Sequence, residues 1–307
     1  MKLKTIIHIP LLLFGFYSYA QPFTIPENIG TQHPRIFGKD MSVSKLQDME
    51  SNNAWAKEII SKTKERIDPY VSYYNKDNTW LKSRLQMYWS EKSTDVFING
   101  GTYDHAEGHA PEPTIKFPGS RGGKTDYLTP KLEDIKPFMD DSRGLYLESR
   151  QHKGQWEWVA ISKTSGIVEG INRKIMGLAR DAAFLYWYTG ERKYADMAYG
   201  VLDTYLKGLY YREVPQDINR GHNITIVGYT SFEVIQEHII NDVAQCYDFL
   251  YGYINKYHTD SLGLYTATLQ KWADLIIKNG VSFNNWNLLE AAHISKIALV
   301  LENDKTY

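Results

Sequence analysis

The chain has 307 residues, 43% hydrophobic and 23% charged, a composition typical of a globular protein that excludes a disordered tail or a coiled coil. Lysine and arginine number 35 against 36 aspartate and glutamate residues, so no basic surplus indicates a nucleic-acid partner. The one cysteine excludes an internal disulfide and a cysteine-based metal site. The aromatic residues (8 Trp, 23 Tyr and 11 Phe) suit sugar rings as well as helix interfaces.

Residues 1–20 have the pattern of a secretory signal peptide. Two lysines precede a short apolar run, and a cleavage site with small residues ends at Ala20. The run is too short to span a bilayer comfortably. We therefore expect an exported protein, secreted or periplasmic, whose mature chain begins at Gln21 and has no membrane partner.

The first half of the mature chain gives weak signals of regular structure. A helical period begins near Ser42 and is predicted to end at Pro69. A second helical stretch is predicted over 78–89. From 90 to 164 glycine and proline interrupt every period. An irregular segment this long is unusual unless it carries function, so we expect it to face a substrate.

The second half is almost continuously helical. Apolar residues recur at spacings of three and four in five segments, which are 165–187, 193–209, one from Thr230 or Ser231 to 250, 261–278 and 285–301. Ser165 is predicted to cap the first of these helices and Gly190 to stop it. The predicted fold class is all-α. Broadly apolar helices joined by short turns favour an (α/α) toroid of stacked helical hairpins over a four-helix bundle.

Three segments carry motifs. They are His33-Pro34-Arg35-Ile36 before a helix, a helix-turn-helix around Thr189-Gly190, and Asn284-Asn285-Trp286-Asn287 at a helix start. The three motifs resemble those of the secreted α/α-toroid polysaccharide lyases, which include alginate lyases and heparinase II/III-type enzymes. The resemblance runs over about 165–304. The resemblance implies β-elimination of a uronic-acid-containing polysaccharide of the alginate, ulvan or glycosaminoglycan type, without a cofactor.

The chain departs from that group in two respects. Trp286 stands where alginate lyases carry a histidine after the asparagine pair. Their catalytic arginine and tyrosine also lie some tens of residues further along, whereas this sequence stops at Tyr307. We therefore expect residues 21–307 to form one lyase-like domain that is the N-terminal part of a longer toroid.

A uronate lyase needs a donor that neutralises the carboxylate, a base near C5 and an acid near the leaving oxygen. The resemblance implies that Asn285 is the carboxylate donor. The polar loop 219–230 offers His222 and Tyr229 for proton transfer and Asn223 for substrate contact, before a predicted helix start that favours anions. The alternatives are simple N-capping by Asn285 and a packed Tyr229 in an ordinary polar connection.

Further side chains are candidates for substrate binding. Trp286 suits stacking on a sugar ring or a place in the helix core. Arg150, His152, Trp156 and Trp158 combine cationic and aromatic surfaces that suit an anionic chain, and they equally suit a packed loop.

Other polar residues are interpreted as structural. His105 and His109 lie four apart, but the acidic residue is displaced by one from the zincin pattern and a helix is disfavoured there, so no metal site is predicted. Residues within predicted helices are interpreted as core or interhelical groups, namely Glu237, His238, Asn241 and His293.

Two other functions remain open. An α/α-barrel glycoside hydrolase needs two carboxylates across a cleft, and no pair stands out among Asp181, Glu191, Glu237 and Glu290. A non-catalytic glycan-binding protein is compatible with the aromatic excess. The unsaturated product that a lyase makes would distinguish the three.

Overall fold

The structure is a computed structural model that describes residues 32–38, 41–92, 96–98, 101–103, 110–117, 124–213, 228–230, 237–280 and 285–301. The expected signal peptide lies outside these residues. So do two of the predicted site residues, His222 and Asn223, and both histidines of the rejected metal motif, His105 and His109.

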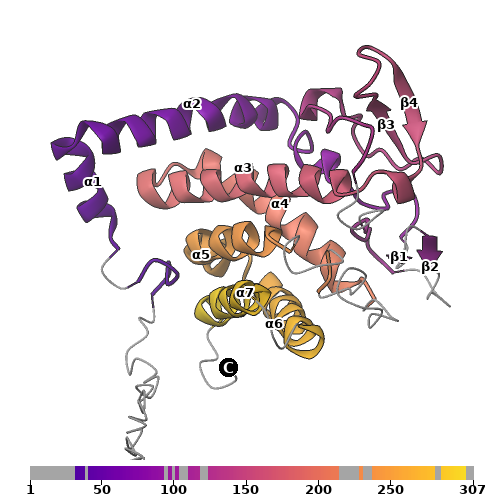
Figure 1. Ribbon diagram of the computed structural model, residues 1–307. Helices are drawn as coiled ribbons and strands as arrows, with labels where there is room; N and C mark the ends of the chain where they lie inside the picture. Colours follow the sequence, from indigo (N-terminus) through magenta and orange to yellow (C-terminus); the bar gives the residue numbers. More distant parts are fainter. Residues whose placement is uncertain are drawn as a thin grey trace, which may run out of the picture.

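Helices dominate the described residues, which confirms the all-α prediction at the level of class (Figure 1). They are α1 (Val43–Asn52), α2 (Ala54–Lys76), α3 (Ile167–Thr189), α4 (Arg192–Tyr210), α5 (Ile239–Tyr257), α6 (Leu262–Asn279) and α7 (Trp286–Val300). Two antiparallel hairpins accompany them, β1 (Val96–Ile98) with β2 (Gly101–Tyr103), and β3 (Leu145–Glu148) with β4 (Trp156–Val159).

The last five helices pack in two layers. In one layer α3 contacts α5 and α5 contacts α7, while in the other α4 contacts α6 (Figure 1). Two contacts show that α3 and α5 run parallel. Arg180, in the middle of α3, binds Asp242 near the start of α5, and Tyr186, near the end of α3, contacts Tyr253 near the end of α5. This is the neighbour pattern of stacked helical hairpins, and the toroid itself stays a prediction.

The core lies between these layers and is rich in aromatic residues. The side chains that are buried almost completely include Tyr194, Tyr205, Tyr229, Tyr265 and Trp272. Part of the aromatic excess is therefore helix packing. No described helix is both long and apolar enough to cross a membrane.

Two predictions for the N-terminal half are wrong. Helix α2 continues through Pro69 to Lys76, because Pro69 is exposed, and Glu65, whose carbonyl loses its helical donor, is exposed as well. Residues 78–89 are not an α-helix. Asp77 Oδ1 accepts hydrogen bonds from the backbone N–H of Thr79 at 2.9 Å and from its hydroxyl at 2.7 Å, and this local turn ends the helix.

Helix boundaries further along mostly agree with the sequence. Gly190 closes α3 in the left-handed conformation, with φ of 75°, as predicted. Gly166 takes the N-cap position of α3 in place of Ser165. Helix α5 begins at Ile239 and not at Thr230 or Ser231, since Glu237 and His238 still form a turn.

The β3–β4 hairpin lies inside the segment that was predicted to be irregular. Leu145 pairs with Val159 and Leu147 with Glu157, and the two leucines of β3 are buried while Tyr146 between them is exposed. This alternation is the ordinary strand signal, but it spans only four residues on each side of the turn.

The motif at residues 33–36 clamps the N-terminal segment to α5. Asp248, which is buried, accepts a hydrogen bond from His33 Nδ1 at 2.6 Å and others from the backbone N–H groups of Arg35 and Ile36 at 2.8–2.9 Å. The Arg35 guanidinium donates to the carbonyl of Leu301 after α7. This part of the resemblance is accounted for by packing.

Candidate functional site

A buried polar cluster lies where α3 and α5 begin and α4 ends, made of Glu169, Tyr205, Arg212, Tyr229 and Glu237. Glu237 is its anchor. It accepts hydrogen bonds from the backbone N–H and hydroxyl of Thr230 at 3.0 and 2.8 Å, and from Trp272 Nε1 at 2.9 Å. These bonds hold the chain around Thr230 against α6.

Arg212 is a fully buried cation in this cluster. Nη1 donates to the carbonyl of Ile115 at 3.1 Å, and the guanidinium lies 4.6 Å from the centre of the Phe117 ring. Nε and Nη2 have no hydrogen-bond partner in the described part of the chain. Loss of hydration lowers the pKa of Arg212 to about 10, so it stays charged at neutral pH.

Tyr229, a predicted proton-transfer residue, belongs to the same cluster. Its exposed fraction is 0%, and its hydroxyl has no hydrogen-bond partner among the described residues. Burial raises its pKa, so the phenol keeps its proton at neutral pH. In this arrangement Tyr229 is a proton donor and not a base, and its complete burial favours the packing interpretation.

Glu169 and Glu237 are the carboxyl pair of the cluster. Burial, with the charge of Glu237 as the second cause, raises the pKa of Glu169 well above its usual range. Both side chains are inaccessible, and Glu237 is occupied by Thr230 and Trp272. This pair therefore serves structure and does not supply the acid and base that a glycoside hydrolase presents to its substrate.

A second group, the histidine cluster, consists of Arg173, His238, His293 and Lys296 on α3, α5 and α7. The two imidazole rings are perpendicular, with their centres 5.7 Å apart. Arg173 is exposed, and His238 and Lys296 are half-buried. The cluster thus brings two cations and two imidazoles together around the start of α5.

Both imidazoles are neutral at neutral pH. Burial lowers the pKa of His293 to about 4, with His238 and Lys296 as further causes. Burial also lowers the pKa of His238, followed by the charges of Arg173 and Lys296. A neutral imidazole beside cations can accept a proton. His238 was predicted to be a core or interhelical group because it lies within a predicted helix, and its cationic neighbours, which come from other helices, could not be seen in the sequence.

Asn285 takes the N-cap position of α7, where it is exposed and helical in its backbone angles. Its side chain makes no capping hydrogen bond, so the simple N-cap alternative is not realised. Trp286 is half-buried and packs against the core, which favours its structural alternative. Asn285 is therefore the better placed of the two to meet a ligand.

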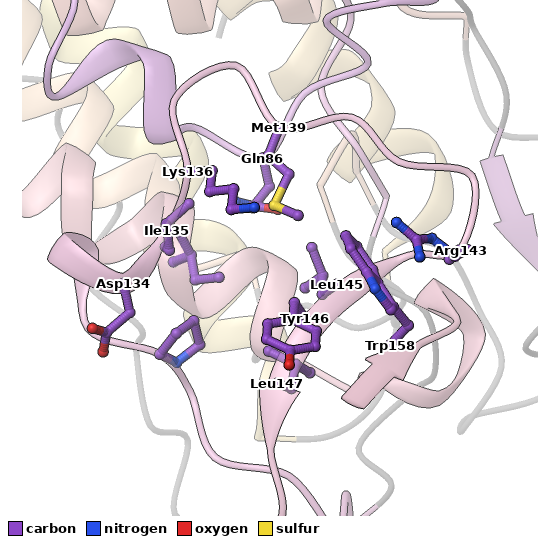
Figure 2. Close-up of a pocket in the computed structure, with 12 residues that line it drawn as sticks. Gln86, Asp134, Ile135, Lys136, Met139, Arg143, Leu145, Tyr146, Leu147 and Trp158 are labelled. Atoms are coloured by element: carbon purple, nitrogen blue, oxygen red, sulfur yellow. The ribbon is translucent and has the colours of Figure 1, made fainter. Parts of the chain in front are cut away.

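Of the four candidates around the β3–β4 hairpin, which are Arg150, His152, Trp156 and Trp158, only Trp158 lines the cavity beside the hairpin. Trp158 lines a cavity of about 400 Å³ together with Tyr146 (Figure 2), whereas the other three are not among its lining residues. Arg150 and His152 are exposed, and Arg150 Nε donates to the carbonyl of Tyr127 at 2.8 Å. Trp156 stacks on Tyr146 with ring centres 5.8 Å apart.

Within the described ranges, no three His, Cys, Asp or Glu side chains are grouped so that they could hold a metal ion. Comparison with models of protein families, with curated proteins and with solved structures finds no match.

Proposed function

We propose that this protein is an exported polysaccharide lyase that cleaves a uronic-acid-containing polymer by β-elimination. The observation that carries the proposal is the histidine cluster, where two cations adjoin two neutral imidazoles around the start of α5. Cations hold the carboxylates of such a polymer, and a neutral imidazole accepts a proton. These are the groups that β-elimination next to a carboxylate requires.

The roles follow from charge and exposure. Arg173 and Lys296 attract the anionic chain, and Asn285 donates a hydrogen bond to the carboxylate of the reacting sugar, which stabilises the enolate as it forms. His238, the more exposed imidazole, takes the C5 proton. The C4–O bond then breaks, and the imidazolium formed on His238 returns the proton to the leaving oxygen.

His222 and Tyr229, predicted from the polar loop 219–230, remain the rival proton-transfer pair. His222 lies outside the described residues. Tyr229 is protonated, as an acid must be, but it meets a substrate only after its surroundings open, because its exposed fraction is 0%. Variants of His222 and His238 distinguish the two assignments.

The test is incubation of the secreted, full-length protein with alginate, ulvan and glycosaminoglycans, following the ultraviolet absorbance of the unsaturated product. Asn285→Ala should lower turnover on the order of 10²–10³-fold, because the lost donor acts mainly in the transition state. His238→Gln should abolish turnover if His238 is the base, whereas His222→Gln should do so under the rival assignment. His258→Gln, which replaces the histidine at the C-terminal end of α5, at the other end of that helix from His238, is the control.

Two outcomes would contradict the lyase proposal. New reducing ends without the unsaturated product would indicate a glycoside hydrolase. Saturable binding of a polymer without any cleavage would indicate a non-catalytic glycan-binding protein. Export is tested separately by the intact mass of secreted protein, which should show Gln21 as the first residue.

A further inference from the structure

The cavity beside the β3–β4 hairpin has the size of a small-molecule site. Its volume is about 400 Å³, within the range of roughly 300–1,000 Å³ that such sites occupy. Figure 2 shows side chains around it from the segment before the hairpin and from both strands, and Ile171 of α3 also lines it. The cavity thus lies at the end of α3 that carries Glu169 and Arg173.

One wall of the cavity is aromatic. Tyr146 and Trp158 stand directly opposite each other on β3 and β4, so both project from the same face of the hairpin. Their ring centres are 5.4 Å apart, and Tyr146 is 45% exposed. A broad apolar surface with hydrogen-bonding edges suits the C–H face of a pyranose ring.

Arg143 is fixed against this wall. Its guanidinium lies 3.9 Å from the centre of the Trp158 ring, and Nε and Nη2 donate to the two carboxylate oxygens of Asp141 at 2.9 and 2.8 Å. Arg143, paired with Asp141, therefore extends the aromatic wall with a cation that contacts the Trp158 ring.

The cavity also presents polar groups. Gln86 is buried, and its amide is oriented because Nε2 donates to the carbonyl of Arg84 at 3.1 Å, while Oε1 has no hydrogen-bond partner among the described residues. A buried acceptor without a donor is unfavourable, and a ligand hydroxyl would remove that cost. Lys136 and Asp134, both exposed, add a donor and an acceptor, and Met139 lines the cavity as well.

We propose that this cavity binds one pyranose unit of a saccharide. The ring stacks on Tyr146 and Trp158, and its hydroxyls bond to Gln86, Lys136 and Asp134. This is a binding site and needs no catalysis, so it stands apart from the lyase proposal. If the protein is a lyase, the cavity binds another part of the same polymer, beside the segment of α3 that carries Arg173 of the histidine cluster.

Calorimetric titration of the full chain tests the proposal with two probes, an alginate tetrasaccharide and a neutral mannan tetrasaccharide. We expect saturable binding of at least one probe, weakened about tenfold or more in Tyr146→Ala and in Trp158→Ala. Trp55→Ala removes an aromatic side chain that is 55% exposed on α2 and should leave the affinity unchanged. Circular dichroism confirms that each variant is folded.

Equal affinities for the two tetrasaccharides would support recognition of the sugar ring alone. A higher affinity for the alginate tetrasaccharide would show that the charge of Lys136 also contributes to binding. The proposal is overturned if neither probe binds, if Tyr146→Ala and Trp158→Ala bind as the unchanged protein does, or if Trp55→Ala loses as much affinity. If Trp158→Ala does not fold, the affinity of Tyr146→Ala decides the question, because Tyr146 is more exposed and its removal disturbs the core less. Binding is measured directly, so the absence of lyase activity would not affect the result.

Discussion

His293 is a buried histidine whose ring Nδ1 has no partner among the described residues and whose neighbours are cationic. Its pKa of about 4 lies below the usual 6.5, so the folded protein favours the neutral ring. Its contribution to stability is complete above pH 6.5 and is lost as the pH falls toward 4. The free energy of unfolding should therefore decrease on acidification by up to about 1.4 kcal/mol per pH unit in this window.

The prediction is that His293→Gln loses less stability between pH 7 and pH 4 than the unchanged protein, measured by urea denaturation at each pH. His152→Gln removes an exposed histidine and should follow the unchanged protein. Parallel curves for all three proteins would contradict the lowered pKa of His293.

At the scale of residues, the sequence could predict chemical type but not accessibility. Asn285 was predicted to be a ligand or an N-cap, and its uncapped, exposed position separates the two. Tyr229 was predicted from its place in a polar loop, but its complete burial involves Trp272 of α6, which no local pattern reveals. His238 was missed for the same reason, since Arg173 and Lys296 come from helices far away in sequence.

At the scale of elements, the β3–β4 hairpin depends on the close approach of Gly144 to Val159. A Cβ at Gly144 would lie 2.0 Å from the Val159 carbonyl oxygen, and φ is +106°. We predict that Gly144→Ala destabilises the protein by more than about 3 kcal/mol and weakens saccharide binding in the cavity. Gly154→Ala in the same hairpin has a φ of +86° and no neighbour within 4 Å, and should cost only about 1 kcal/mol.

Urea denaturation of the two glycine variants measures the difference. Equal destabilisation would mean that backbone conformation alone, and not the contact with Val159, decides the effect.

The clamp at Asp248 gives a second prediction for an element. Asp248→Asn replaces one acceptor oxygen by a donor that faces His33 and the N–H groups of Arg35 and Ile36. We expect a loss of about 2 kcal/mol in unfolding free energy and faster hydrogen exchange over 32–38. Asp274→Asn, on an exposed face of α6, is the matched control. Unchanged exchange over 32–38 would show that other contacts hold this segment.

Long helices were predictable because apolar residues recur at spacings of three and four over many turns, so the bounds of α3, α4, α6 and α7 agree with the sequence within two residues. Short elements were not. The hairpin gives only four residues of alternation per strand, and the turn at Asp77 is one side chain competing with a helix. The helix end predicted at Pro69 was wrong because the cost of a proline inside a helix depends on its exposure, which the sequence does not show.

At the scale of the whole molecule, two layers of helices leave their last members partly uncovered. Helix α7 packs on α5 and α6, and its described neighbours do not reach Leu288, which is 74% exposed. Ile277 on α6 is 56% exposed. Large exposed apolar side chains on neighbouring helices favour association with other apolar surfaces.

We therefore predict that the purified chain self-associates as its concentration rises, and that Leu288→Lys reduces this association without lowering stability, because the side chain it replaces is mostly in water. Sedimentation velocity over a series of concentrations measures the effect. Ser295→Lys adds the same charge at an exposed position of α7 without removing an apolar side chain, so it separates charge repulsion from the loss of apolar contact. If both lysine variants reduce association equally, repulsion is sufficient and Leu288 has no special part. If the unchanged chain stays monomeric throughout, its uncovered helix faces are compatible with water as they stand.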